Sequence, residues 1–105
     1  MKWDIEFTQE AKKDLIGLDN SQQIQVLKAI RKVSGNPLPT SEGGYGKPLG
    51  NRMSGKLAGY LKIKLQKIGL RVVYCLVRNV NVMRIIIISV RDDETVYKLA
   101  QKRIQ

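Results

Sequence analysis

The stretch LAGYLKIKLQKIGLRVVYCLVRNVNVMRIIIISV, residues 57–90, decides the fold. It contains three β-rich segments, which are Leu57 to Gln66, Leu70 to Val77 and Val80 to Val90. Short turns at residues 67–69 and 78–79 separate them, and strands joined by tight turns form an antiparallel meander. The run of four isoleucines at residues 85–88 does not alternate, which is typical of a strand that is buried on both faces. We therefore place the third strand inside the sheet.

A short strand is predicted at the N-terminus, where Trp3, Ile5 and Phe7 alternate with acidic residues. One face of such a strand is buried and the other faces water. We expect this strand to join an edge of the sheet.

Two helices are predicted between this strand and the meander. The first spans Thr8 to Leu18, with Thr8 as its N-cap, and the second begins after Asp19, whose spacing to Gln22 resembles a capping box. The connection is short, so the two helices form an antiparallel hairpin that covers one face of the sheet and leaves the other for function. The apolar stripe of the second helix consists of Val26, Ile30 and Val33 with Ile24 and Leu27 beside them.

The remaining segments complete the expected order. Residues 36–55 are rich in Gly and Pro and are predicted to form a long loop. Three acidic residues at 92–94 favour the start of a final helix, in which Tyr97, Ala100 and Ile104 share one face. The order β-α-α-β-β-β-α predicts an α+β fold in a single domain over residues 1–105.

Composition excludes several classes of function. The 105 residues include no His and a single Cys, Cys75, so a Ser-His-Asp triad, a His-containing metal site and an internal disulfide are excluded. Without a His to activate it, Cys75 is interpreted as a small buried hydrophobic residue. No apolar stretch is long enough to span a membrane and the first residues lack a signal-peptide pattern, so we expect a cytoplasmic protein.

The basic residues are distributed unevenly. The chain carries 19 Lys and Arg against 9 Asp and Glu, a net charge of +10, yet no acidic residue occurs between Glu42 and Asp92. Such a concentration of cations predicts a polyanion as partner, because like charges on neighbouring strands destabilise a sheet. The alternative is a solvated basic face that aids solubility. The ten cations of this stretch are Lys47, Arg52, Lys56, Lys62, Lys64, Lys67, Arg71, Arg78, Arg84 and Arg91.

Three of these cations are predicted to converge. Lys62 and Lys64 are two residues apart on one strand and therefore share a face. If the turn lies at residues 67–68, Gln66 pairs with Gly69 and Lys64 lies opposite Arg71. Clustered cations lower each other's proton affinity, so one lysine could act as a general base while the others hold a phosphate. Binding without catalysis remains open at this point.

The order of elements and two motifs resemble the RelE toxins of bacterial type II toxin–antitoxin modules. The motifs are KLAGYLKIKLQKIGLRVVY at residues 56–74 and ISVRDDETVYKLA at residues 88–100. The resemblance implies the small RelE/ParE-like fold and a toxin that cuts mRNA in the ribosomal A site. In that reaction the ribose 2′-hydroxyl attacks the adjacent phosphate, without a metal or cofactor.

The resemblance also implies roles for individual residues. Lys62 and Lys64 match the two strand lysines that serve as base and as phosphate stabiliser, and Arg71 matches the arginine that holds the reacting phosphate. Tyr97 matches a tyrosine that stacks on or orients the substrate base, and Arg91 matches a cation suited to the leaving-group oxygen. The family's Gly before that cation is missing here, and Asp93 takes the slot when the segment is aligned from Tyr97. The further RNA contacts are expected at Lys47, Arg52, Lys56 and Lys67.

The implied partners are a cognate acidic antitoxin, the 70S ribosome with its mRNA, and operator DNA only through the antitoxin complex. Two other functions compete with ribosome-dependent cleavage. One is a ParE-like inhibitor of DNA gyrase, which has the same fold but needs no cation cluster on its sheet. The other is a non-catalytic nucleic-acid-binding module, against which the small number of stacking aromatic residues counts.

Overall fold

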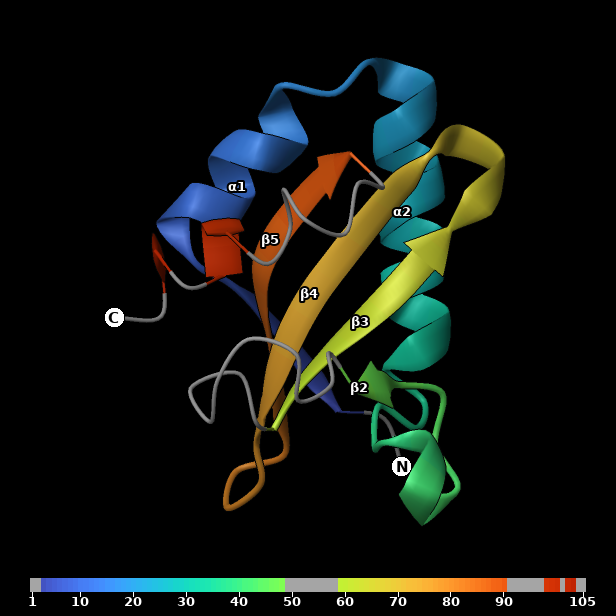
Figure 1. The fold of residues 1–105 in the computed structure, drawn as a ribbon, viewed down its shortest axis with the longest axis vertical. Helices are drawn as coiled ribbons and strands as arrows, with labels where there is room; N and C mark the ends of the chain where they lie inside the picture. The colour runs from blue at the N-terminus through green and yellow to red at the C-terminus, as the bar shows by residue number, and fades with distance from the viewer. Residues whose placement is uncertain (1–2, 49–58, 91–97, 101, 104–105) are drawn as a thin grey trace.

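A computed structural model describes residues 3–48, 59–90, 98–100 and 102–103. Its centre is a five-stranded sheet with the order β1-β5-β4-β3-β2 (Figure 1). β1 runs parallel to β5, and the other neighbouring strands are antiparallel. This confirms the predicted α+β fold, the meander and the edge position of the first strand. The strands are β1 (Asp4–Phe7), β2 (Lys47–Pro48), β3 (Tyr60–Leu65), β4 (Leu70–Val77) and β5 (Val82–Val90).

Helices α1 (Gln9–Ile16) and α2 (Asn20–Val33) lie on one side of the sheet (Figure 1). Both predicted N-termini are confirmed. The Thr8 hydroxyl accepts a hydrogen bond from the Ala11 amide at 3.1 Å, and Asp19 and Gln22 form a capping box. Each cap satisfies amides that the first turn leaves without an intrahelical partner.

The main core lies between the helices and the sheet. From α2 it contains Val26, Ile30 and Val33, as the stripe predicts. Ile24, which we placed beside that stripe, is instead 64% exposed, because it falls on the opposite side of the helix from the sheet. The strand residues of this core are Leu61, Ile63, Leu70, Val72, Tyr74, Met83, Ile85 and Ile88.

A β-bulge explains how β5 fills both faces of the sheet. Pairing with β4 shifts between Val73, which faces Ile87, and Tyr74, which faces Ile85. Ile86 is therefore an extra residue, and a bulge of this kind interrupts strict alternation. Ile85 and Ile88 join the helix-side core, whereas Ile86 and Ile87 pack on the other face with Val73 and Ala100.

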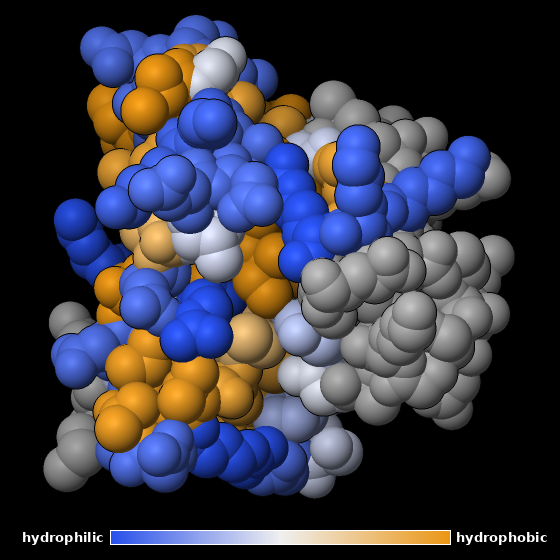
Figure 2. All heavy atoms as spheres, turned by 90° about the vertical axis from the view of Figure 1, so that its left-hand side faces the viewer, coloured by the Kyte–Doolittle hydropathy of each residue, from blue (hydrophilic) through white to orange (hydrophobic). Residues whose placement is uncertain are grey.

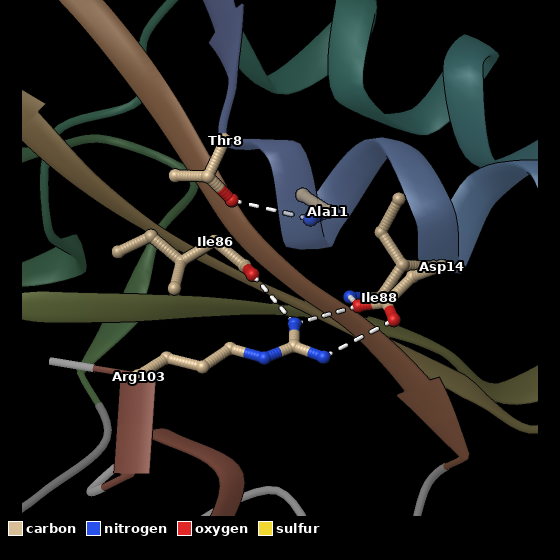
Figure 3. Close-up of polar contacts among 6 residues, drawn as sticks. All are labelled: Thr8, Ala11, Asp14, Ile86, Ile88 and Arg103. Carbon is tan, nitrogen blue, oxygen red and sulfur yellow. Dashed lines mark hydrogen bonds and ion pairs between the residues drawn. The ribbon is translucent and has the colours of Figure 1, made fainter.

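An ion pair covers the edge of β5 beyond the end of β1 (Figure 3). Asp14 of α1 accepts a hydrogen bond from the Ile88 amide at 3.0 Å, and Arg103 donates one to the Ile86 carbonyl at 2.8 Å. The two side chains also pair with each other, at 2.8 Å between Nη1 and Oδ2. The pair thus satisfies edge groups that a neighbouring strand would otherwise satisfy. Residues 98–100 and 102–103 are helical, in agreement with the predicted final helix.

The glycine-rich segment before β2 contains more structure than the predicted loop. It includes a 3₁₀ turn at Thr40–Glu42 and the two-residue strand β2, which pairs with β3. A Cβ on Gly44 would lie 2.0 Å from the Leu38 carbonyl oxygen, and one on Gly46 would lie 2.2 Å from the Tyr74 hydroxyl. That hydroxyl donates to the Pro37 carbonyl at 2.7 Å, so the segment is fastened to the sheet by close backbone approach.

Figure 2 views the side of the molecule on which α1 lies. Hydrophilic residues cover much of it, and hydrophobic residues reach the surface in separate patches. The large hydrophobic side chains that are exposed include Ile16 and Ile24 from the helical hairpin. Within the described residues, no helix is both long and apolar enough to cross a membrane.

Candidate functional site

The face of the sheet opposite the helices is arranged in rows across the strands. Cross-strand partners share a face, so the register places Tyr60 beside Cys75, Lys62 beside Val73 and Lys64 beside Arg71. The first row continues through Arg84 to Glu6, the second to Ile87 and the third to Ser89. Charge and polarity therefore increase along β3 and β4 toward the turn that joins them.

Lys64 lies directly opposite Arg71, as the sequence predicts. The ladder closes at Leu65 and Leu70, one pair earlier than expected, because Gln66–Ile68 forms a 3₁₀ turn. Gly69 ends this turn with φ 65°, in the left-handed region that glycine adopts without steric cost. The longer turn preserves the predicted register, so the expected meeting of the two cations is confirmed.

The three converging cations differ in exposure. Lys64 is exposed, Arg71 is half-buried with its Nη1 atom enclosed, and Lys62 is only 9% exposed. Lys62 shares the face of Lys64, as predicted, but its burial was not foreseen. It lies opposite the exposed Lys47 of β2. The short strand β2 thus brings a fourth cation to the same face.

A small cavity of about 140 Å³ lies at the Lys64 end of this face. Lys64 and Arg71 supply its charged groups, and no carboxylate lines it among the described residues. An exposed ammonium next to a half-buried guanidinium is suited to bind a phosphate, since the guanidinium can donate two parallel hydrogen bonds. The cavity is lined by Lys64, Leu65, Gln66, Leu70 and Arg71.

The row farthest from the turn has a different character. Arg84 donates a hydrogen bond to Glu6 at 2.6 Å, and burial raises the pKa of the Cys75 thiol. Burial also raises the pKa of the Tyr60 phenol. Cys75 is half-buried and protonated at neutral pH, which agrees with its interpretation as a packing residue rather than a nucleophile. Tyr74 lies fully buried on the helix side, as predicted, and burial strongly raises the pKa of its phenol.

Two of the ten cations form ion pairs, although the sequence between Glu42 and Asp92 contains no acidic residue. Arg84 pairs with Glu6, and Arg78 pairs with Glu42 at 2.8 Å. Both carboxylates lie outside or at the end of the stretch without acids, and the fold places each of them beside its arginine. Among the described cations of this stretch, Lys64 and Lys67 at the β3–β4 turn form no ion pair with a described carboxylate.

Several predicted site residues lie outside the described residues, namely Arg52, Lys56, Arg91 and Tyr97. Lys67 lies within the described residues, is exposed in the 3₁₀ turn, and lines a groove together with Lys64. No group of three or more potential metal ligands of the Cys, Asp and Glu types occurs within the described parts of the chain.

The chain and its fold were compared with known proteins. No protein-family model matches the chain. A protein of Escherichia coli described as a RelE-like toxin is 28% identical over 109 residues, and the alignment covers all of both chains. A solved structure of E. coli toxin RelE, an arginine-to-alanine double variant in the free state, matches with a TM-score of 0.75, 26% identity and complete coverage of both chains.

The chain is therefore similar to the RelE toxins in both sequence and fold. The isolated E. coli RelE toxin also matches, with a TM-score of 0.69 and 25% identity over 98% of this chain and 99% of that one. The E. coli RelE double variant bound to an antitoxin RelB peptide matches with a TM-score of 0.67, 26% identity and complete coverage of both chains. The predicted resemblance to the RelE family is confirmed, and the comparisons support a RelE-like toxin of a toxin–antitoxin system.

Proposed function

We propose that this RelE-family chain inhibits translation as a ribosome-dependent endoribonuclease that cuts mRNA in the A site of the 70S ribosome. The observation that carries the proposal is the direct pairing of Lys64 with Arg71 at the end of the open face. Their cavity contains two cations and, among the described residues, no carboxylate, which is the electrostatic environment a reacting phosphate requires.

In the proposed reaction, the ribose 2′-oxygen attacks the adjacent phosphorus and loses its proton. The bond from phosphorus to the 5′-oxygen of the next nucleotide breaks, and that oxygen leaves with a proton. The products are a 2′,3′-cyclic phosphate and a free 5′-hydroxyl. Arg71 would hold the non-bridging oxygens, and Lys62 and Lys64 would share the roles of base and charge stabiliser. Side-chain cations supply the positive charge, so the proposal needs no metal.

Residues outside the described parts complete the proposed site. Arg91 would stabilise the leaving oxygen, and Tyr97 would stack on or orient the substrate base. Lys47 and Lys67, with Arg52 and Lys56, would contact phosphates of the RNA without reading its sequence. These contacts predict a steep salt dependence of binding.

The proposal includes a cognate antitoxin as partner in the cytoplasm. Solved RelE structures contain an antitoxin chain or peptide, and the net charge of +10 suits an acidic partner that folds on binding. Operator DNA would be contacted only through that complex.

The test is to incubate the purified protein with ribosomes stalled on a defined message and to map RNA ends by primer extension. New ends inside the A-site codon, absent with ribosome-free RNA, are the expected result. An intact message would contradict the proposal. If the protein then inhibits DNA supercoiling by gyrase, the ParE-like alternative replaces it.

A further inference from the structure

A second, larger groove lies between α2 and the β3–β4 turn. It has a volume of about 660 Å³, within the range of roughly 300–1,000 Å³ typical of ligand clefts. Its floor is apolar and consists of Ala29, Leu65 and Ile68, which also pack against the main core. In Figure 1 the β3–β4 turn lies at the same edge of the molecule as α2, which agrees with the groove being lined by residues of both.

All the charged residues on the rim of this groove are basic. Lys28 and Lys32 come from α2, and Lys64 and Lys67 come from β3 and the turn. All four are exposed, and no ion pair joins any of them to a carboxylate in the part of the chain that the structure describes. We call these four residues the rim lysines.

The two helix lysines are placed at a cost to the isolated protein. Lys28 and Lys32 are four residues apart and therefore lie on the same side of α2. Like charges at this spacing destabilise a helix, and α2 contains no acidic residue to relieve them. A bound polyanion would remove this repulsion.

The groove and the proposed cleavage cavity are continuous. Lys64, Leu65 and Gln66 line both of them, so a strand whose phosphate lies at Lys64 and Arg71 can pass over the turn into the groove. This continuity favours RNA over an acidic protein segment as the occupant.

We infer that the groove binds nucleotides of single-stranded RNA flanking the phosphate that is cut, with backbone phosphates on the rim lysines and sugars or bases on the apolar floor. The inference rests on the proposed function, because it takes the bound strand to be the substrate. It adds Lys28 and Lys32 to the RNA-binding surface.

The test compares two double variants that remove the same charge, Lys28→Ala with Lys32→Ala and Lys12→Ala with Lys13→Ala. Lys12 and Lys13 are exposed on α1, away from the groove lining. The probe is a fluorescent single-stranded RNA with 2′-O-methyl riboses, which cannot be cut, in a long form and in a form too short to reach both cavity and groove. Fluorescence anisotropy is measured over a series of salt concentrations.

For the long RNA, the groove variant should bind about 3- to 10-fold more weakly and lose about 1.4 from its salt slope, as expected for two lost phosphate contacts. The α1 variant should bind like the wild type, and the short RNA should not distinguish the two variants. Equal affinity of both variants for the long RNA overturns the inference. A Glu- and Leu-rich peptide that distinguishes them where RNA does not would assign the groove to an acidic protein segment.

Cleavage on programmed ribosomes is measured in parallel for the wild type. Cleavage without the anisotropy difference removes the groove inference and leaves the nuclease. The anisotropy difference without cleavage removes the nuclease and leaves an RNA-binding groove.

Discussion

The two ends of the open face use their cations differently. At the β1–β5 side, Arg84 pairs with Glu6 and Arg103 pairs with Asp14. Around the β3–β4 turn, Lys64 and Lys67 have no carboxylate partner among the described residues. A cation that is neutralised within the fold serves the fold. A cation that lies beside other cations and has no counter-charge is instead available to an external anion. Ion pairing thus distinguishes cations that stabilise this small sheet from cations that can bind a ligand.

The largest expected effect is on catalysis. Arg71→Ala should lower the single-turnover cleavage rate on programmed ribosomes by about 10²- to 10³-fold, the usual loss when one donor to a developing anion is removed. Arg84→Ala removes the same charge at the other end of the face and should leave the rate within a few-fold. Equal losses in both variants would abolish the distinction between the two ends.

The next effect is on stability. Arg103→Ala should lower the free energy of unfolding by about 2 kcal/mol, because it leaves Asp14 and the Ile86 carbonyl without their shared donor. Lys102→Ala, which removes an exposed charge from the same helical segment, should change it by less than about 0.5 kcal/mol. Urea unfolding measures both, and an unchanged midpoint for Arg103→Ala would show that the pair does not hold the β5 edge.

The smallest effect concerns an exposed pair. A hydrogen bond from Arg78 lowers the pKa of Glu42 below its ordinary value. A carboxyl group whose pKa is lower in the folded state contributes stability above its unfolded pKa and loses it as pH falls through the folded pKa. The stability difference between wild type and Arg78→Ala should therefore be present at neutral pH and disappear in acid. A difference that persists below the folded pKa would show that Arg78 acts through packing instead.

Most of the fold follows from residues 57–90, because strand period and turn spacing together favour an antiparallel meander, and a turn at residues 67–68 gives one particular register. That register also predicts the meeting of Lys64 and Arg71. Two features of the sheet could not be predicted from strand period and turn spacing. β2 has only two residues, too few to show a period, and the bulge at Ile86 depends on how both faces pack.

Long-range polar contacts could not be predicted for a different reason. Asp14 and Arg103 are 89 residues apart, and their pairing depends on where the final helical residues meet α1. Lys62, which is buried, lies opposite β2, a strand too short for its sequence to predict. The groove lysines had a signal that could have been used, since Lys28 and Lys32 share a side of a helix without acidic residues.

The most direct test of the account compares Lys64→Ala with Arg103→Ala in one experiment. Both variants are incubated with programmed ribosomes, below the unfolding temperature of the less stable one, and RNA ends in the A-site codon are measured by primer extension. We expect Lys64→Ala to be as stable as the wild type but not to cut, and Arg103→Ala to be less stable but still to cut. Cleavage by a folded Lys64→Ala variant at the wild-type rate would contradict this expectation.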